Sequence, residues 1–311
     1  AGLVVSDGAN IVLSKSTTGG VVTLNISNGG SSADDLVITE GSTLSLGNLL
    51  NLRLAAGTGA NPTRAKIAGE LNVADRDYHT NNSNVVTTVE TTGILRVANG
   101  SVTSTSASRL IFSGDATYIH GRNGGTIPTA NWNSFSTVMI TGVTTTVPSG
   151  LGQTFGNLIW ENGNQSGSES FGAENMAING AFVINSTGSG RLVMDRSLSA
   201  AYFLLNGGYL EIGNGVLSSI ALNVNGNMIM SGGTINVNSG LFLTTGALNL
   251  KGSLSFTGGT ITETSGFITG ADIVFSGSDI QEFSKSGSAT ISGGVNFTVS
   301  TGATLDMGTS V

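Results

Sequence analysis

Short runs in which apolar and polar residues alternate recur along the whole chain. Examples are Val22-x-Leu24-x-Ile26, Leu50-x-Leu52-x-Leu54 and Leu254-x-Phe256. Each run spans about 3 to 8 residues and is bounded by Gly-, Asn- or Ser-rich turns, which is typical of half-buried β-strands. Long helical periodicity is absent from the sequence. The pattern therefore predicts an all-β protein built from many short strands.

An internal repeat is the most specific feature of the sequence. Residues Leu222–Ile235 align without a gap with Leu248–Ile261, 26 residues further on, and the alternating apolar positions stay apolar in both copies. Looser copies are found at Ile178–Phe182 and Leu205–Tyr209, and a second short unit occurs at Gly41–Gly47 and Gly302–Gly308.

A repeat of this length predicts a solenoid of stacked coils. One coil cannot bury its own inward-facing Leu, Val, Ile and Phe side chains, whereas stacked coils bury them in one column. Strands of successive coils then run parallel, and a right-handed path is expected because that hand dominates parallel crossovers. We therefore expect a right-handed parallel β-helix. The alternative is a string of β-sandwiches with hairpins at Asn179-Gly180 and Asn225-Gly226.

The domain organisation follows from the same pattern. Residues 1–311 are expected to form a single β-helix region, with less regular, elaborated coils between 121 and 167. Neither end shows a helical or strongly polar cap, and Ala1–Val5 lacks the features of a signal peptide. We expect the chain to be part of a longer protein, in which both ends continue into further coils or abut another domain.

Composition and charge narrow the range of partners. Only 10% of residues are charged, the net charge is −7, and no basic run is present, so nucleic acid is not an expected partner. No apolar stretch approaches the roughly 20 residues that span a bilayer, so membrane insertion is not expected. The lack of cysteine excludes disulfides and thiolate metal sites.

The less regular block carries a family resemblance. The strings Tyr118–Trp132, Ser136–Gly142 and Pro148–Trp160 resemble large secreted surface proteins of Bacteroidetes, which have Gly-, Thr- and Asn-rich β-helical regions. The specific part of the match covers about residues 113–162. The resemblance implies an adhesin-like or gliding-associated protein at the outer cell surface, exported by the type IX secretion system. The carboxy-terminal sorting domain of that family is not found here.

One group of polar residues could carry chemistry. Asp75, Asp77 and His79 alternate, so in a strand all three would project to one side. Two carboxylates and an imidazole could bind a divalent ion such as calcium, or act as acid and base. The alternative is a solvated outer face, since exposed Asp and His are ordinary surface residues. No cofactor is expected.

Other single residues have simpler explanations. Asp34-Asp35 is expected to form a turn, because no spaced calcium-ligand loop surrounds it. His120 is expected in a surface turn, and Trp160 in the core. Trp132 lies in an irregular segment and is the better candidate for a surface contact with a ligand such as a sugar. The run Thr144–Thr146 stands alone, so a threonine-based ice-binding face is not expected.

Two functions follow from these observations. The first is a non-enzymatic extracellular module, a rigid β-helical rod that displays or spaces binding surfaces and contacts glycans or other surfaces. The second is a polysaccharide-active β-helix enzyme, a lyase or glycoside hydrolase, centred on Asp75, Asp77 and His79. Secretion machinery and further parts of the same polypeptide are the other expected partners.

Overall fold

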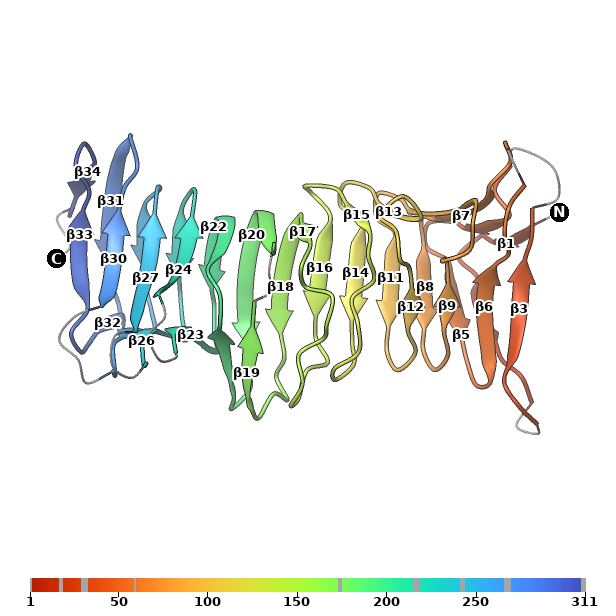
Figure 1. Ribbon diagram of the computed structural model, residues 1–311, viewed down its shortest axis with the longest axis horizontal. Coiled ribbons are helices and arrows are strands. Elements are labelled where there is room, and N and C mark those ends of the chain that lie inside the picture. Colours follow the sequence, from red (N-terminus) through yellow and green to blue (C-terminus); the bar gives the residue numbers. More distant parts are fainter. Residues whose placement is uncertain are drawn as a thin grey trace. The chain divides into compact units, whose positions relative to one another are not determined.

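The computed structural model describes residues 2–16, 19–28, 33–58, 60–172, 175–214, 219–240, 244–265 and 270–308. The described residues form short strands without a helix, and the strands stack into a parallel β-solenoid (Figure 1). The predicted parallel β-helix is therefore confirmed, and the β-sandwich alternative is not. With no helix described, nothing in this part of the chain could cross a membrane as an apolar helix.

The chain divides into two compact units. Unit 1 comprises residues 1–142 and 148–150, and unit 2 comprises residues 143–147 and 151–311. The division falls inside the 121–167 block, where the alternating pattern of the sequence loosens.

Unit 1 has three parallel sheets, one on each side of its coils. The first contains β1 (Leu3–Val5), β4 (Leu36–Ile38), β7 (Thr63–Ile67), β10 (Val85–Val89), β13 (Leu110–Phe112) and β15 (Asn131–Trp132). The second contains β2 (Asn10–Leu13), β5 (Thr43–Leu46), β8 (Glu70–Val73), β11 (Ile94–Val97), β14 (Thr117–His120) and β16 (Thr137–Ile140). The third contains β3 (Val22–Ile26), β6 (Leu50–Leu54), β9 (Tyr78–His79) and β12 (Val102–Thr103).

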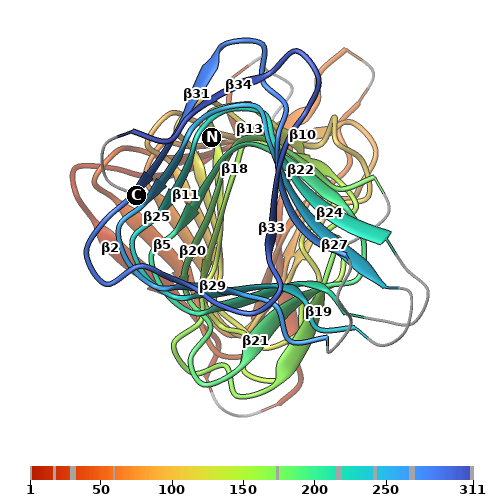
Figure 2. The same cartoon turned by 90° about the vertical axis from the view of Figure 1, so that its left-hand side faces the viewer.

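Unit 2 is built in the same way. One sheet contains β19 (Ser168–Phe171), β21 (Arg191–Met194), β23 (Tyr209–Gly213), β26 (Thr234–Asn238), β29 (Thr260–Thr262) and β32 (Thr290–Ile291). The other strands are β17 (Thr154–Phe155), β18 (Asn157–Glu161), β20 (Ala177–Ser186), β22 (Leu198–Leu205), β24 (Ser219–Val224), β25 (Met228–Met230), β27 (Thr245–Leu250), β28 (Leu254–Phe256), β30 (Ala271–Phe275), β31 (Ile280–Lys285), β33 (Asn296–Val299) and β34 (Thr304–Asp306). Figure 2 shows β19, β21 and β29 on a different side of the coils from β24 and β27.

The 26-residue sequence repeat sets the register in which two neighbouring coils of unit 2 pair. Ser219 pairs with Thr245, Met228 with Leu254 and Thr234 with Thr260, each 26 residues apart. Because all three strands of one coil keep this offset, equivalent side chains of the two copies lie one above the other.

Glycine is required at one corner of this repeat. Gly233 and Gly259 occupy equivalent places and have φ values of 73° and 90°, a region that other residues rarely adopt. A Cβ atom added to Gly259 would lie 2.4 Å from the carbonyl oxygen of Gly233 in the coil below. The repeated Gly-Gly-Thr motif thus lets the backbone turn sharply and lets adjacent coils approach closely.

The predicted core register is confirmed. Eight side chains expected to point inward are all at most 1% exposed: Leu222, Val224, Met228, Met230, Leu248, Leu250, Leu254 and Phe256. Stacked aromatic rings extend this column, with centroid separations of 5.5 Å for Phe171–Phe182 and 5.4 Å for Phe182–Phe203. Each coil therefore buries its apolar residues only by resting on its neighbours.

Replacing Phe256 by Asp should unfold the coil that contains it. The side chain is fully buried, and an unpaired carboxylate there would cost several kcal/mol. The adjacent Ser255→Asp is the matched control, because Ser255 points to the opposite face and is partly exposed. Urea denaturation followed by circular dichroism should show a large loss of stability for Phe256→Asp alone. Equal losses in the two variants would contradict the register.

Candidate functional site

The structure gives Asp75, Asp77 and His79 three separate roles. Asp75 lies in a bend and forms an ion pair with the adjacent Arg76, at 3.5 Å. Asp77 accepts hydrogen bonds from the backbone N–H and the hydroxyl of Ser101 in the next coil, at 3.0 and 2.7 Å. The Nδ1 atom of His79 lies 3.2 Å from the hydroxyl of Thr103.

The contacts of Asp77 and His79 run between coils, that of Asp75 stays within one turn, and the three side chains do not converge on a shared point. Within the described ranges, no three His, Asp or Glu side chains gather in a way that could hold a metal ion. Asp77 and His79 instead tie β9 and the turn before it to the next coil, at β12 and the turn before that strand.

Trp132 was predicted at the surface but lies in the core of unit 1. The side chain is 8% exposed and its ring stacks on Phe112 at a centroid distance of 4.3 Å. The reason is register: Phe112 pairs directly with Trp132, so the indole follows the inward column of β13. A sugar could not stack on a ring in this position. Trp160, predicted in the core, is fully buried there.

His120 was expected in a surface turn and is instead a core residue of unit 1. It pairs with Ile140 in the next strand and is fully buried. Its Nε2–H donates to the carbonyl oxygen of Gly124 at 2.7 Å, and Nδ1 lies 3.2 Å from the hydroxyl of Tyr118. Burial lowers the pKa of His120, and the nearby Arg122 guanidinium acts in the same direction. Burial likewise raises the pKa of Tyr118.

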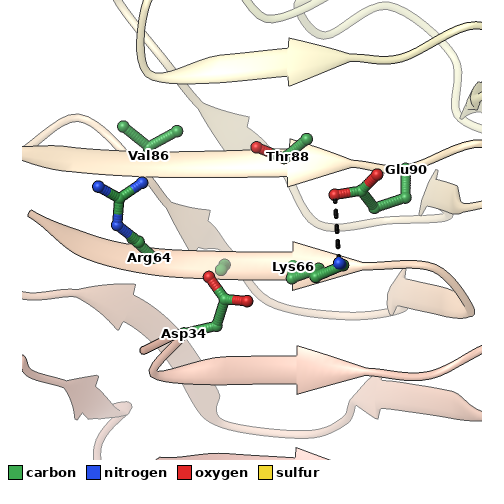
Figure 3. A pocket seen from close by; sticks show the side chains of 7 residues that line it. Asp34, Arg64, Lys66, Val86, Thr88 and Glu90 are labelled. Carbon is green, nitrogen blue, oxygen red and sulfur yellow. Dashed lines mark ion pairs between the residues drawn. The ribbon is translucent and has the colours of Figure 1, made fainter. Parts of the chain in front are cut away.

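A surface depression on the first sheet of unit 1 collects several charged side chains (Figure 3). It has a volume of about 260 Å³ and is lined by Asp34, Arg64, Ala65, Lys66, Val86, Thr88 and Glu90. Parallel pairing of β7 with β10 places Arg64 opposite Val86 and Lys66 opposite Thr88. Alternation explains the lining, because these four residues point outward while their neighbours fill the core.

Two charges in this depression are paired and two are not. Lys66 Nζ lies 3.8 Å from a carboxylate oxygen of Glu90. Figure 3 shows the Arg64 guanidinium directed toward β10 and the Asp34 carboxylate directed toward β7. The described residues provide neither of these two groups with a hydrogen-bond or ion-pair partner.

Arg64 differs in this respect from the other cations of unit 1. Every other Lys or Arg side chain of that unit contacts a described acceptor: Lys15, Arg53, Lys66, Arg76, Arg96, Arg109 and Arg122. Arg64 is also only partly exposed. The depression thus presents one half-buried guanidinium whose donors are unused.

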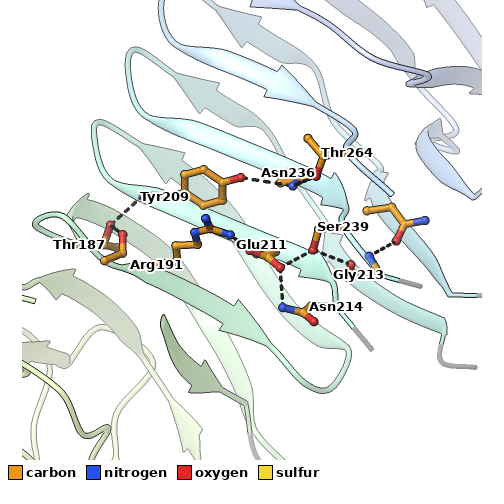
Figure 4. A network of polar contacts seen from close by, with 12 residues as sticks. Thr187, Arg191, Tyr209, Glu211, Gly213, Asn214, Asn236, Ser239 and Thr264 are labelled. Atoms are coloured by element: carbon orange, nitrogen blue, oxygen red, sulfur yellow. Dashed lines mark hydrogen bonds and ion pairs between the residues drawn. The ribbon is translucent and has the colours of Figure 1, made fainter. Parts of the chain in front are cut away.

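A polar network occupies the outer face of one sheet in unit 2 (Figure 4). Glu211 is 2% exposed and accepts hydrogen bonds from Arg191 at 3.2 Å, from Asn214 at 2.5 Å and from the hydroxyl of Ser239. The Arg191 guanidinium also lies 5.0 Å from the centre of the Tyr209 ring. Glu211 therefore holds together side chains from three strands or the turns that follow them.

Polar ladders along the coils recur elsewhere in unit 2. Amide and hydroxyl groups link Glu161, Asn185, Asn206 and Ser231 in a chain of hydrogen bonds from coil to coil. A second column stacks the hydroxyl residues Thr234, Thr260 and Thr290. The column beside this one contains Asn236, Thr262 and Ser292, so the Thr-x-Thr pattern is complete in one coil only.

Sequence reasoning missed both the depression and the network. Asp34, Arg64 and Glu90 are about one coil apart in the sequence, and only stacking brings them together. Asp34-Asp35 was expected to form a turn, and Asp35 lies in a bend just before β4; its carboxylate also accepts the backbone N–H of Arg64 at 3.0 Å. Aligning the coils of unit 1 in the sequence would have placed these residues side by side, but the repeats of unit 1 are too irregular to align.

Comparisons with known proteins add no further assignment. No protein-family model, no curated protein and no solved structure matches this chain.

The stability of unit 1 should fall in mildly acidic solution because of His120. Its pKa is lowered on folding, so below the ordinary value of 6.5 the unfolded chain binds the proton more readily and folding is disfavoured. His120→Gln keeps an N–H donor for Gly124 but does not titrate, so its stability should change less between pH 7 and pH 5. Hydrogen exchange of peptides covering β14 measures this. Equal pH dependence in both proteins would contradict the prediction.

Glu211→Ala should destabilise unit 2 by about 1–3 kcal/mol, because Arg191, Asn214 and Ser239 would lose the buried carboxylate that accepts their hydrogen bonds. Glu161→Ala is the control, since Glu161 is exposed at the start of a surface ladder. Urea denaturation should separate the two variants by at least half of that amount. An unchanged midpoint for Glu211→Ala would show that solvent replaces the network without cost.

Proposed function

We propose that this chain is a non-enzymatic structural module, a β-solenoid that displays and spaces binding surfaces outside a bacterial cell. One observation carries this proposal: the polar side chains best suited to chemistry are used to join coils. Asp77 is bound to Ser101, His79 to Thr103, and Glu211 to donors from neighbouring strands.

The outer faces of the coils support a display role. Backbone pairing repeats the same spacing from coil to coil, so outward side chains form ordered columns on a fixed lattice. Such a surface can meet an extended, repetitive partner such as a glycan at many equivalent points. Energetically modest contacts then add up along the solenoid.

The cellular setting is proposed from the resemblance alone. Residues of the 121–167 block resemble secreted surface proteins of Bacteroidetes, so we propose an adhesin-like role at the outer cell surface, after export by the type IX secretion system. Gliding-associated attachment belongs to the same proposal.

A glycan array combined with a reducing-end assay tests the proposed function. We expect binding to one or more extended glycans without release of reducing ends, because Asp77 and His79 are each hydrogen-bonded to the next coil and do not form an acid–base pair. Release of reducing ends that is abolished in Asp75→Asn, Asp77→Asn or His79→Ala would establish the polysaccharide-active enzyme instead. Glu40→Gln, an exposed acidic position, serves as the control for these variants.

A further inference from the structure

We propose that the depression around Arg64 binds a hydroxylated monocarboxylate, the group that a uronic acid residue of an acidic glycan presents. This inference rests on the proposed function, since it names the ligand class of one displayed surface. Its starting point is the half-buried guanidinium of Arg64, which has no partner among the described residues although every other Lys or Arg side chain of unit 1 contacts an acceptor there.

A carboxylate matches the free guanidinium in charge and shape. Arg presents its donors in a planar fork, and carboxylates accept two parallel hydrogen bonds from it. Because Arg64 is fixed on a strand that pairs on both sides, β4 and β10, little backbone ordering is needed on binding. The partial burial of its side chain strengthens the contact relative to a fully exposed one.

The surrounding charges favour a singly charged ligand over a dianion. Asp34 and Glu90 line the same depression, so a phosphate monoester, which carries close to two negative charges at neutral pH, would add charge close to two carboxylates. Lys66 offsets only one of them, through its ion pair with Glu90. A monocarboxylate places one negative charge at Arg64 and leaves the rest of the ligand neutral.

The remaining lining suits hydroxyl groups. The unpartnered carboxylate of Asp34 can accept a hydrogen bond from a ligand hydroxyl, and the Thr88 hydroxyl can donate or accept another. Val86, which lies opposite Arg64 on β10, supplies an apolar patch for the C–H face of a sugar ring. At about 260 Å³, the depression is smaller than a typical drug-sized pocket and fits a single sugar residue.

Calorimetric titration of the full chain with an oligogalacturonide tests this site. We expect saturable binding that weakens in high salt, and a loss of about 10-fold or more in affinity for Arg64→Ala. Arg64→Lys keeps the charge but not the fork and should lie between the two. Arg53→Ala is the matched control, because Arg53 lies on another sheet and contacts Asn25. Unchanged binding by Arg64→Ala, or a loss of equal size in Arg53→Ala, would overturn the proposal.

Three further ligands show which chemical group is recognised, and whether a failure concerns carboxylate recognition or glycan binding as a whole. Free galacturonate should bind at the same site, because one sugar residue fills the depression. Its binding should be weaker than that of the oligomer, which can also contact the surface beside the depression. The methyl-esterified oligomer should not bind there. If the ester or a sulfated glycan binds as well as the acid, carboxylate recognition is wrong while glycan display stands. If the array shows no glycan binding at all, the glycan-binding part of the proposed function fails as well.

Discussion

The in-register pairing of parallel strands between neighbouring coils is the constraint on which each unit depends. Side chains alternate between the core and the surface along a strand, so the register of one coil fixes the orientation of every residue in the next. A slip of one residue would turn the column of Leu248 and Phe256 outward and bring their polar neighbours inside. The glycine corners and the coil-to-coil hydrogen bonds of Asp77 and Glu211 act in support of that register.

Much of the fold could be predicted where the sequence repeats its own pattern. The 26-residue offset between Leu222 and Leu248 identified strands, corners and the core face together, because a stacked coil must present the same residue types at the same places. Side-chain placement was predicted less well where the repeats vary in length. His120 and Trp132 were both placed at the surface because Gly- and Asn-rich neighbours suggested turns. Register with the preceding coil, which the sequence does not display, draws both into the core.

The surface sites could be predicted far less well, for a related reason. Candidate chemistry was sought among residues close in sequence, such as Asp75 and Asp77. In a solenoid, however, neighbours on a face are one coil apart, as Arg64 and Val86 are. The structure therefore separates polar residues that bond to a neighbouring coil, such as Asp77 and His79, from others such as Arg64 and Asp34, whose side chains have no partner among the described residues.

The coil-by-coil construction of unit 2 has a mechanical consequence. The described strands of each coil pair only with strands of the neighbouring coils. A force that pulls on one end of unit 2 would therefore detach one coil at a time. Peeling off a coil of 26 residues would release roughly 90 Å of extended chain. Successive coils, which differ in length, would detach in separate steps. A solenoid of this kind can therefore lengthen under load while its remaining coils keep their surfaces intact.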